Sequence, residues 1–395
     1  MSTLNFNSHK FFVALPFGLI FLVNVLITQM KGFDYSGQLA LSSGLAGMLT
    51  TILIFHCDIQ ILMKEKKVIP EMLSRGTYII FIMMIVFIFA INAFNLVHIY
   101  PYINSILALS AGAMAMSELL LSALLKVGEI KAWIFFRSLV PLSLIVLVGN
   151  EIPPQLSWLY SYVGPLMLTV LYLIYIKNPH IYFRNLPIKP LGINQSTFML
   201  SATVTTLLTN LMVLFWLIVI DIKLGEFQAG IWINAYRIFA LPYVFIGATF
   251  LPFFLSKTGD SIDEFHKSQL LLKFIYFLLM VFGVFSPILY FFGSKIFLLF
   301  SQQGYELDQY FVGMIILICF FQTVMQHFKH FFETVGKSLL FLFMLIFQLC
   351  VGYFIVLTIS TESLNSIVEI ILLITTFAFA IFSIMLFFIL KIKNS

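Results

Sequence analysis

The sequence predicts an all-α integral membrane protein, a bundle of about twelve transmembrane helices with little protein outside the bilayer. Of its 395 residues, 61% are hydrophobic and only 10% are charged, and the mean hydropathy is +1.04. Soluble domains are typically about 45–50% apolar and about 25% charged. Apolar stretches of membrane-spanning length recur along the whole chain, and basic residues gather in alternate connections between them.

A spanning helix needs roughly 20 mostly apolar residues, because the hydrocarbon core is about 30 Å thick and a helix rises 1.5 Å per residue. The chain satisfies this rule at residues 11–30, 38–62, 77–97, 103–125, 132–149, 157–176, 198–220, 228–255, 270–292, 310–326, 339–358 and 367–390. The longest connections have about 15–20 residues, so no extramembrane domain is predicted that could house a soluble active site.

The distribution of lysine and arginine predicts the orientation in the membrane. One set of alternate connections holds most of these residues, including Lys64, Lys66, Lys67, Arg75, Lys126, Lys131, Lys177, Arg184 and Lys189. The opposite set holds Lys31, Lys223 and Lys295. Because cytoplasmic loops carry the excess of basic residues, we expect both termini to be cytoplasmic, which requires an even number of spans.

Two pairs of similar segments indicate an internal repeat. Val127 and Gly128 follow the fourth span, and Val335 and Gly336 follow the tenth; likewise, the segment 34–37 enters the second span and 226–230 enters the eighth. Corresponding elements lie six helices apart in the same orientation, which is typical of two parallel six-helix lobes. The predicted lobes are residues 1–190, which include the connecting cytoplasmic loop, and residues 191–395.

Motifs of soluble enzymes are absent from the sequence: it has no GxGxxG, GxxxxGK, HExxH or GxSxG. The three cysteines lie in apolar segments without a CxxC pair. His327, His330 and Glu333 are spaced in steps of three, so they turn around the helix, and no fourth ligand accompanies them. We expect no metal, no cofactor and no nucleic acid.

Charged residues at membrane depth are the strongest functional signal, since each costs about 2.5–3.5 kcal/mol on insertion scales. Arg237 lies near the middle of the eighth span and shares a helical face with Gly230, Asn234 and Leu241. The seventh span carries a comparable arc of Thr203, Thr206 and Asn210. These residues predict a cationic, hydroxyl-lined wall for an anionic cargo. The alternative is an arginine paired with a carbonyl or carboxylate for folding.

Three further charges have two interpretations each. Asp58 ends a small and polar stripe near the cytoplasmic end of the second span, and Glu118 faces small residues in the fourth. Either carboxylate is a candidate to bind a coupling proton or Na⁺, with an interfacial anchor or a structural hydrogen bond as the alternative. Arg137 begins the fifth span, where it is either a cargo contact or a side chain that snorkels to the interface.

Four stretches carry a resemblance to a known family: Asp34-Tyr35-Ser36-Gly37-Gln38-Leu39-Ala40-Leu41, Gly230-Ile231-Trp232-Ile233-Asn234-Ala235-Tyr236-Arg237, Leu251-Pro252 and Val335-Gly336-Lys337. They resemble Wzx-type flippases of lipid-linked oligosaccharides, the O-antigen translocases of the multidrug/oligosaccharidyl-lipid/polysaccharide exporter (MOP) superfamily. The similarity extends over most of the chain as scattered positions.

The resemblance implies two lobes around a central cavity lined by spans one, two, seven and eight. The polar residues of these spans are Asn24, Thr28, Thr51, Thr203, Asn210, Asn234 and Arg237. It also implies a non-enzymatic transporter of the bacterial inner membrane, acting in lipopolysaccharide and polysaccharide biosynthesis. Its cargo would be an undecaprenyl pyrophosphate or related polyprenyl-pyrophosphate-linked oligosaccharide, moved by alternating access from the cytoplasmic to the periplasmic leaflet. Membrane lipid and a coupling H⁺ or Na⁺ are its other expected partners.

Two alternatives remain open. A cation-coupled multidrug exporter of the same superfamily should concentrate carboxylates in the cavity, whereas the most central charge here is Arg237. An O-antigen polymerase or ligase should resemble its relatives in a large periplasmic loop rich in arginine or histidine. The longest expected periplasmic loop, Gly293 to Gln309, contains one lysine and neither of those residues.

The charge distribution makes a testable prediction of topology. Reporter domains fused in the connections 64–75 and 177–189 should be active as cytoplasmic fusions, and those fused in 293–309 as periplasmic fusions. Paired alkaline phosphatase and fluorescent protein fusions measure this directly. The reverse pattern would contradict the orientation of every span.

Overall fold

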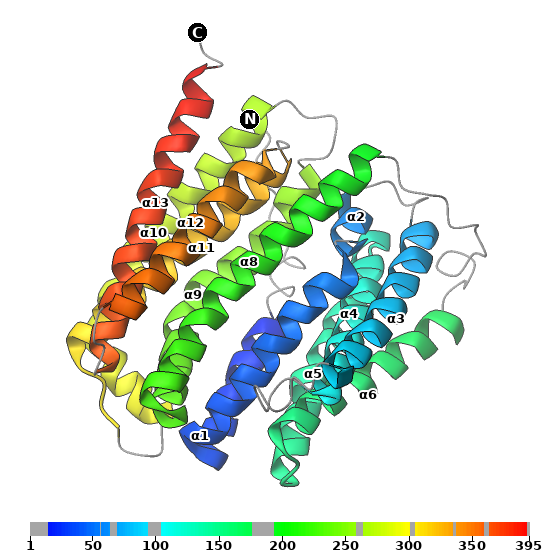
Figure 1. Cartoon of the computed structure of the whole chain (residues 1–395), viewed down its shortest axis with the longest axis horizontal. Coiled ribbons are helices and arrows are strands. Elements are labelled where there is room, and N and C mark those ends of the chain that lie inside the picture. The colour runs from blue at the N-terminus through cyan, green and yellow to red at the C-terminus, as the bar shows by residue number, and fades with distance from the viewer. Residues whose placement is uncertain are drawn as a thin grey trace.

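The computed structural model describes residues 15–55, 57–63, 69–93, 104–175, 193–257, 264–300, 305–334, 337–358 and 363–392. The elements in these ranges are all α-helices (Figure 1), which confirms the predicted fold class. They are α1 Leu15–Ile54, α2 Cys57–Met63, α3 Ile69–Ala93, α4 Ser105–Val127, α5 Ile130–Gly149, α6 Pro154–Tyr175, α8 Ile193–Leu224, α9 Glu226–Lys257, α10 Glu264–Phe300, α11 Gln309–Thr334, α12 Ser338–Thr358 and α13 Leu364–Ile392.

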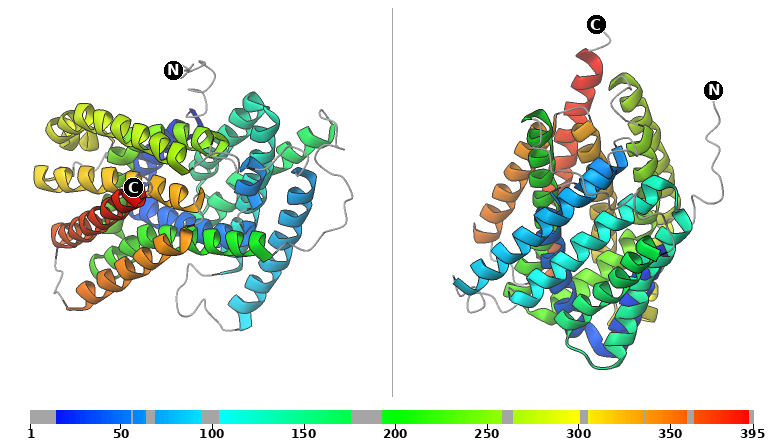
Figure 2. Two further views of the ribbon diagram at one scale, coloured as in Figure 1. Left: turned by 90° about the horizontal axis from the view of Figure 1, so that it is seen from above. Right: turned by 90° about the vertical axis from the view of Figure 1, so that its right-hand side faces the viewer.

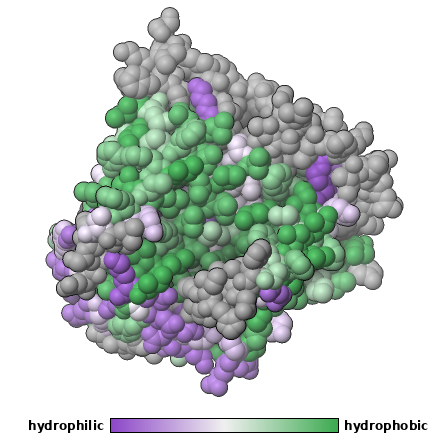
Figure 3. Space-filling model, in the orientation of Figure 1, coloured by the Kyte–Doolittle hydropathy of each residue, from purple (hydrophilic) through white to green (hydrophobic). Residues whose placement is uncertain are grey.

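Length and composition make the helices membrane-spanning. Within the described ranges, nine helices are long and apolar enough to cross a bilayer, and α12 adds a shorter apolar stretch, Leu339–Ile355. Hydrophobic side chains cover much of the visible face, while hydrophilic residues gather toward its lower edge (Figure 3). Exposed apolar surface of this extent is stable against lipid and not against water. The chain is therefore a multi-pass membrane protein.

Helix α1 contains the first two predicted spans. Its continuous apolar segment of 37 residues is far longer than one crossing requires. Gly32 interrupts it with φ 85° and ψ 179°, a conformation that a residue with a side chain rarely adopts. Val23 and Ile27 before the kink pack in one cluster with Leu39 after it. The sequence predicted a connection between residues 30 and 38, but the chain reverses at a single glycine.

The second predicted span, 38–62, is shorter in the structure. Phe55 has a positive φ of 46° and ends α1, and α2 begins as a separate short helix at Cys57. Asp58 therefore lies in the first turn of α2. The sequence predicted that Asp58 would continue the small and polar stripe of Gly47 and Thr51. In the structure it does not.

Helix α10 is longer than predicted and runs through the residues assigned to a periplasmic loop. Gly293 lies inside this helix, where a Cβ would be 2.8 Å from atoms of Phe239 and Val312. One turn later, Phe297 is buried and stacks on Phe33 with ring centroids 5.7 Å apart. This packing extends α10 to Phe300, so only the end of the segment 293–309 connects two helices.

The helices form the two lobes expected from the sequence repeat. Helices α1 to α6 lie together on the right in Figure 1, and α8 to α13 lie on the left. The view from above shows the same division (Figure 2, left). The first lobe has its own hydrophobic cluster, with residues from Leu53 to Leu173. The second lobe has a larger cluster, which Phe33, Ala40 and Leu41 of α1 join. The predicted boundary between residues 190 and 191 lies outside the described residues.

The backbones of α1 and α9 touch where the lobes meet. A Cβ on Gly37 would lie 3.0 Å from the Glu226 carbonyl oxygen, and a Cβ on Gly230 would overlap the carbonyl oxygen of Phe33. Such approach is possible only where both helices lack a side chain. This glycine contact fixes how closely the second lobe can lie against α1.

A methyl group at Gly230 should separate the two helices. We expect Gly230→Ala to cost about 1–3 kcal/mol, because the overlap is with backbone that cannot rotate away. The matched control is Gly164→Ala in α6, where a Cβ has no atom within 4 Å. Thermal unfolding of the purified proteins in detergent should show a lower midpoint for Gly230→Ala alone. Equal midpoints in the two variants would contradict the close approach.

Candidate functional site

Asn234 of α9 joins the two lobes by buried hydrogen bonds. Its Oδ1 accepts a hydrogen bond from Thr28 Oγ1 at 2.8 Å, and its Nδ2 donates to Ser36 Oγ at 2.7 Å. The same Nδ2 donates to the Gly230 carbonyl of its own helix at 2.8 Å. Thr28 precedes the Gly32 kink and Ser36 follows it. One amide therefore binds both halves of α1.

Two more hydrogen bonds cross between α1 and the second lobe. Gln38 Nε2 donates to Glu226 Oε2 at 2.9 Å, and Asn210 Nδ2 of α8 donates to Thr51 Oγ1 at 3.0 Å. Together with the Asn234 contacts they form a row along α1, which we call the polar seam. Its residues are Thr28, Ser36, Gln38, Thr51, Asn210, Glu226 and Asn234.

Arg237 lies one turn beyond Asn234 on α9 and is half-buried. Its Nη1 is buried without a hydrogen-bond partner, and in the part of the chain that the structure describes it forms no ion pair with a carboxylate. A buried guanidinium nitrogen without an acceptor loses its hydration without compensation. An acceptor oxygen from a ligand would remove that cost. Arg237 is therefore the best-placed cation for binding an anion.

Two further residues predicted to bind cargo, Thr203 and Asn24, have different surroundings. Thr203 of α8 is buried, and its Oγ1 has no partner among the described residues. It lies two turns from Asn210, on the same helical face. Asn24 is also buried, but its Nδ2 donates to the Ile20 carbonyl of its own helix at 2.7 Å. Thr203 can accept a new hydrogen bond without breaking one, whereas Asn24 must first give up a bond within α1.

Three charges predicted for two different roles come together in the first lobe. Arg137 Nη1 of α5 donates to Glu118 Oε2 of α4 at 2.6 Å, with the side chains 20% and 29% exposed. The guanidinium also lies 5.4 Å from the centroid of the Trp133 ring. Asp58 is close enough to act on Arg137 electrostatically. We call Asp58, Glu118 and Arg137 the charge cluster.

The charge cluster thus places two carboxylates within electrostatic reach of one guanidinium. In this conformation Arg137 is engaged by Glu118, so it contacts a cargo only after the pair opens. The predicted roles of these residues in ion coupling and cargo binding thus depend on the same hydrogen bond.

Sequence reasoning missed several residues of the site. Ser36 and Gln38 lie two positions apart, which places them on different faces of a straight helix. In the structure they meet α9 at different positions, Ser36 at Asn234 and Gln38 at Glu226. Apart from its apolar character, nothing in the sequence indicated that Trp133 belongs to the site. The polar composition of the segment entering the second span was the one available indication.

The charge cluster makes a prediction about stability. Glu118→Leu leaves Arg137 without its partner, and we expect a loss of about 2 kcal/mol, below the about 3–5 kcal/mol of a fully buried pair because both side chains are partly exposed. The double variant Glu118→Leu and Arg137→Leu should recover most of this loss. Glu306→Leu, at an exposed residue outside the helices, is the control. Unfolding midpoints in detergent measure these effects, and an unchanged midpoint in Glu118→Leu would show that the pair contributes nothing.

No family model and no curated protein matches this sequence. Solved structures do match. A multidrug resistance MATE family transporter of the MOP superfamily, in an outward-facing conformation, has a TM-score of 0.67 and 13% identity over 98% of this chain and 96% of that chain. A MATE structure in the straight conformation has a TM-score of 0.67 and 15% identity over 98% and 95%. A MOP superfamily transporter from Pyrococcus furiosus, reported with a binding pocket of reversed polarity that suggests a different function, has a TM-score of 0.65 and 14% identity over 98% and 95%. The chain thus has the two-lobed, all-α fold of MATE transporters.

Proposed function

We propose that this protein is a membrane transporter of the MOP superfamily, and not an enzyme, that moves its cargo by alternating access. The fold that it shares with MATE transporters over 98% of its length supports the class. The resemblance of its sequence to Wzx-type proteins supports the same superfamily independently. In this proposal the polar seam is the contact that opens and closes.

The energetics of the seam suit a contact that must break. Each lobe has its own hydrophobic cluster, so the lobes keep most of their packing when they move apart. The seam itself depends on hydrogen bonds between neutral side chains, apart from the Gln38 contact with Glu226. Each such bond contributes only about 0.5–1.5 kcal/mol net, because water can replace it. A modest difference in the affinity of the two conformations for the cargo or the ion would then shift the equilibrium between them.

Arg237 is the observation that favours an anionic cargo. Its unpartnered Nη1 lies one turn from the seam, and Thr203 and Asn210 carry polar groups on α8. A guanidinium binds phosphate oxygens through paired, charge-assisted hydrogen bonds. We therefore propose that the cargo is a polyprenyl-pyrophosphate-linked oligosaccharide, such as an O-antigen repeat. It would be flipped from the cytoplasmic to the periplasmic leaflet of a bacterial inner membrane, with both termini of the protein in the cytoplasm.

A multidrug exporter is the second candidate, and the shared fold favours it, since one matched structure is a multidrug resistance transporter. The Pyrococcus furiosus transporter has the same fold and a pocket of reversed polarity. The charge of the site, and not the fold, must therefore separate the two candidates. The positive charge of Arg237 would repel an organic cation, whereas the carboxylates of Glu226 and of the charge cluster would attract one.

Coupling to an ion gradient is a further part of the proposal. A proton or Na⁺ would bind at the carboxylates of Asp58 and Glu118, which both act on the Arg137 guanidinium, and would neutralise negative charge there. Neutralising that charge weakens the hold on Arg137, which would then be available to the cargo. The coupling ion and the cargo headgroup would thus compete for one guanidinium.

The cargo proposal predicts the effect of replacing Arg237. Arg237→Gln removes the charge and should lower glycan display at the cell surface by at least about tenfold, with lipid-linked repeats accumulating in the cytoplasmic leaflet. Arg237→Lys keeps the charge but loses the paired geometry, so partial display is expected. Lys273→Gln, which removes an exposed charge from α10, is the control.

The measurement is surface glycan per molecule of membrane-inserted protein, in cells that make the lipid-linked repeat but lack their own flippase. Normal display by Arg237→Gln at equal abundance would rule out a cargo-binding role for Arg237. If the unaltered protein exports organic cations and does not restore display, the multidrug exporter is the correct function.

A further inference from the structure

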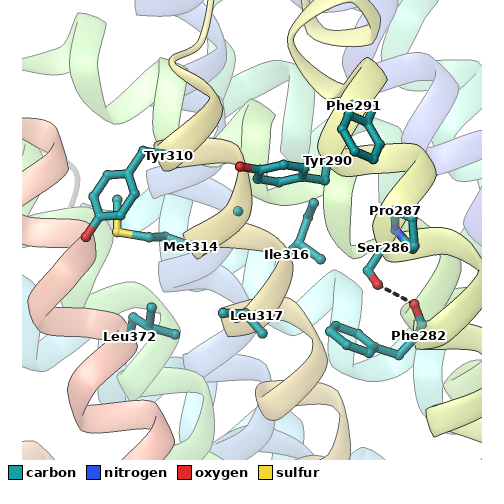
Figure 4. Close-up of a pocket in the computed structure, with 11 residues that line it drawn as sticks. Phe282, Ser286, Pro287, Tyr290, Phe291, Tyr310, Met314, Ile316, Leu317 and Leu372 are labelled. Atoms are coloured by element: carbon teal, nitrogen blue, oxygen red, sulfur yellow. Dashed lines mark hydrogen bonds between the residues drawn. The ribbon is translucent and has the colours of Figure 1, made fainter.

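An apolar groove lies on the second lobe, away from the polar seam. Helix α11 forms its floor, with α10 and α13 as its two walls (Figure 4). Its volume is about 530 Å³, within the range of about 300–1,000 Å³ that is usual for ligand pockets. We call it the α10–α13 groove, and its main lining residues are Phe282, Tyr290, Phe291, Tyr310, Leu317 and Leu372.

A glycine and a proline, Gly313 and Pro287, make room for the groove. Gly313 lies in its floor, and a Cβ there would be 3.2 Å from Cε2 of Tyr290, so the tyrosine ring lies directly over the glycine. Pro287 in the α10 wall cannot donate a backbone hydrogen bond and loosens the helix at that turn. Beside it, Ser286 Oγ is bonded to the Phe282 carbonyl, so its hydroxyl does not need a partner in the groove.

The groove opens toward the lipid. In the membrane-spanning part of α10, only 22% of the hydrophobic window is buried. Phe291 is 68% exposed and Tyr310 is 57% exposed. A hydrocarbon chain is the natural occupant of an apolar groove on such a surface.

Opposite charges flank one end of the groove, near the start of α11 and the end of α10. On the α13 wall, the exposed carboxylate of Glu369 lies one turn before the lining residue Leu372 and is close enough to act on Tyr310 electrostatically. On the α10 wall, exposed Lys295 lies one turn beyond Phe291 on the same helical face. Tyrosines are enriched where the hydrocarbon meets the lipid headgroups, which assigns this end to the membrane interface.

We propose that the α10–α13 groove binds a zwitterionic aminophospholipid of the phosphatidylethanolamine type. One acyl chain lies along the groove, the phosphate contacts the Lys295 ammonium, and the lipid's own ammonium contacts Glu369. A phosphatidylglycerol headgroup has a phosphate but no cation, so it satisfies Lys295 and leaves the Glu369 carboxylate without an opposite charge. The two walls therefore select the headgroup, while the floor accepts the chain.

Leu317→Trp, in the floor, tests the acyl-chain part by filling the groove, and Leu372→Trp fills it from the other wall if the first variant folds poorly. Leu171→Trp in α6 is the matched control, since Leu171 is exposed on the first lobe. The detergent-purified protein is titrated with phosphatidylethanolamine and phosphatidylglycerol. Native mass spectrometry then measures the bound lipid and the oligomeric state in one experiment. Filling the groove should lower phosphatidylethanolamine retention about tenfold, and Leu171→Trp should leave it unchanged.

Glu369→Gln tests the headgroup part: it should abolish the preference for phosphatidylethanolamine over phosphatidylglycerol while the total bound lipid stays the same. Equal retention by the filled and control variants would overturn the proposal, as would an unchanged preference in Glu369→Gln. A polyprenyl phosphate that displaces phosphatidylethanolamine, or a dimer in place of a lipid adduct, would assign the groove to another occupant.

Discussion

The close contact between α1 and α9 is the constraint on which the rest of the structure depends. Gly37 and Gly230 allow the two backbones to touch, and Gly32 reverses α1 just before that point. The reversal brings Thr28 and Ser36 to the same amide, Asn234. A larger residue at either glycine would move α9 outward and separate these groups by more than a hydrogen-bond length. The polar seam therefore exists only because three positions lack a side chain.

The two lobes reach stability by different kinds of packing. In the first lobe, α4 is lined with small residues, among them buried Ala111, Ala115 and Ala123, which allow neighbouring helices to approach closely. The second lobe is filled with aromatic rings, and Phe341 stacks on Phe382 with centroids 4.7 Å apart. Each lobe thus has its own core, while residues of α1 also contribute to the core of the second lobe.

Charge is arranged differently in the lobes and at the seam. Arg137 is paired with Glu118 at 2.6 Å in the first lobe, and Arg75 is paired with Glu71 at 2.9 Å near the end of the same lobe. Arg237 has no such carboxylate among the described residues. Burying a charge without a partner is costly, and this cost is the basis for our proposal that Arg237 binds a ligand.

The sequence by itself determined the membrane class, the positions of most helices and the two-lobed repeat. Hydropathy and the length of apolar stretches are local properties, and a bilayer enforces them without reference to the rest of the chain. The sequence also singled out Asn234 and Arg237, because a polar group at membrane depth is conspicuous wherever it points. Only the tertiary structure decided what each of these groups meets. The kink at Gly32, the break at Phe55 and the meeting of Arg137 with Glu118 result from contacts between distant segments, and periodicity along one helix contains no information about its partner.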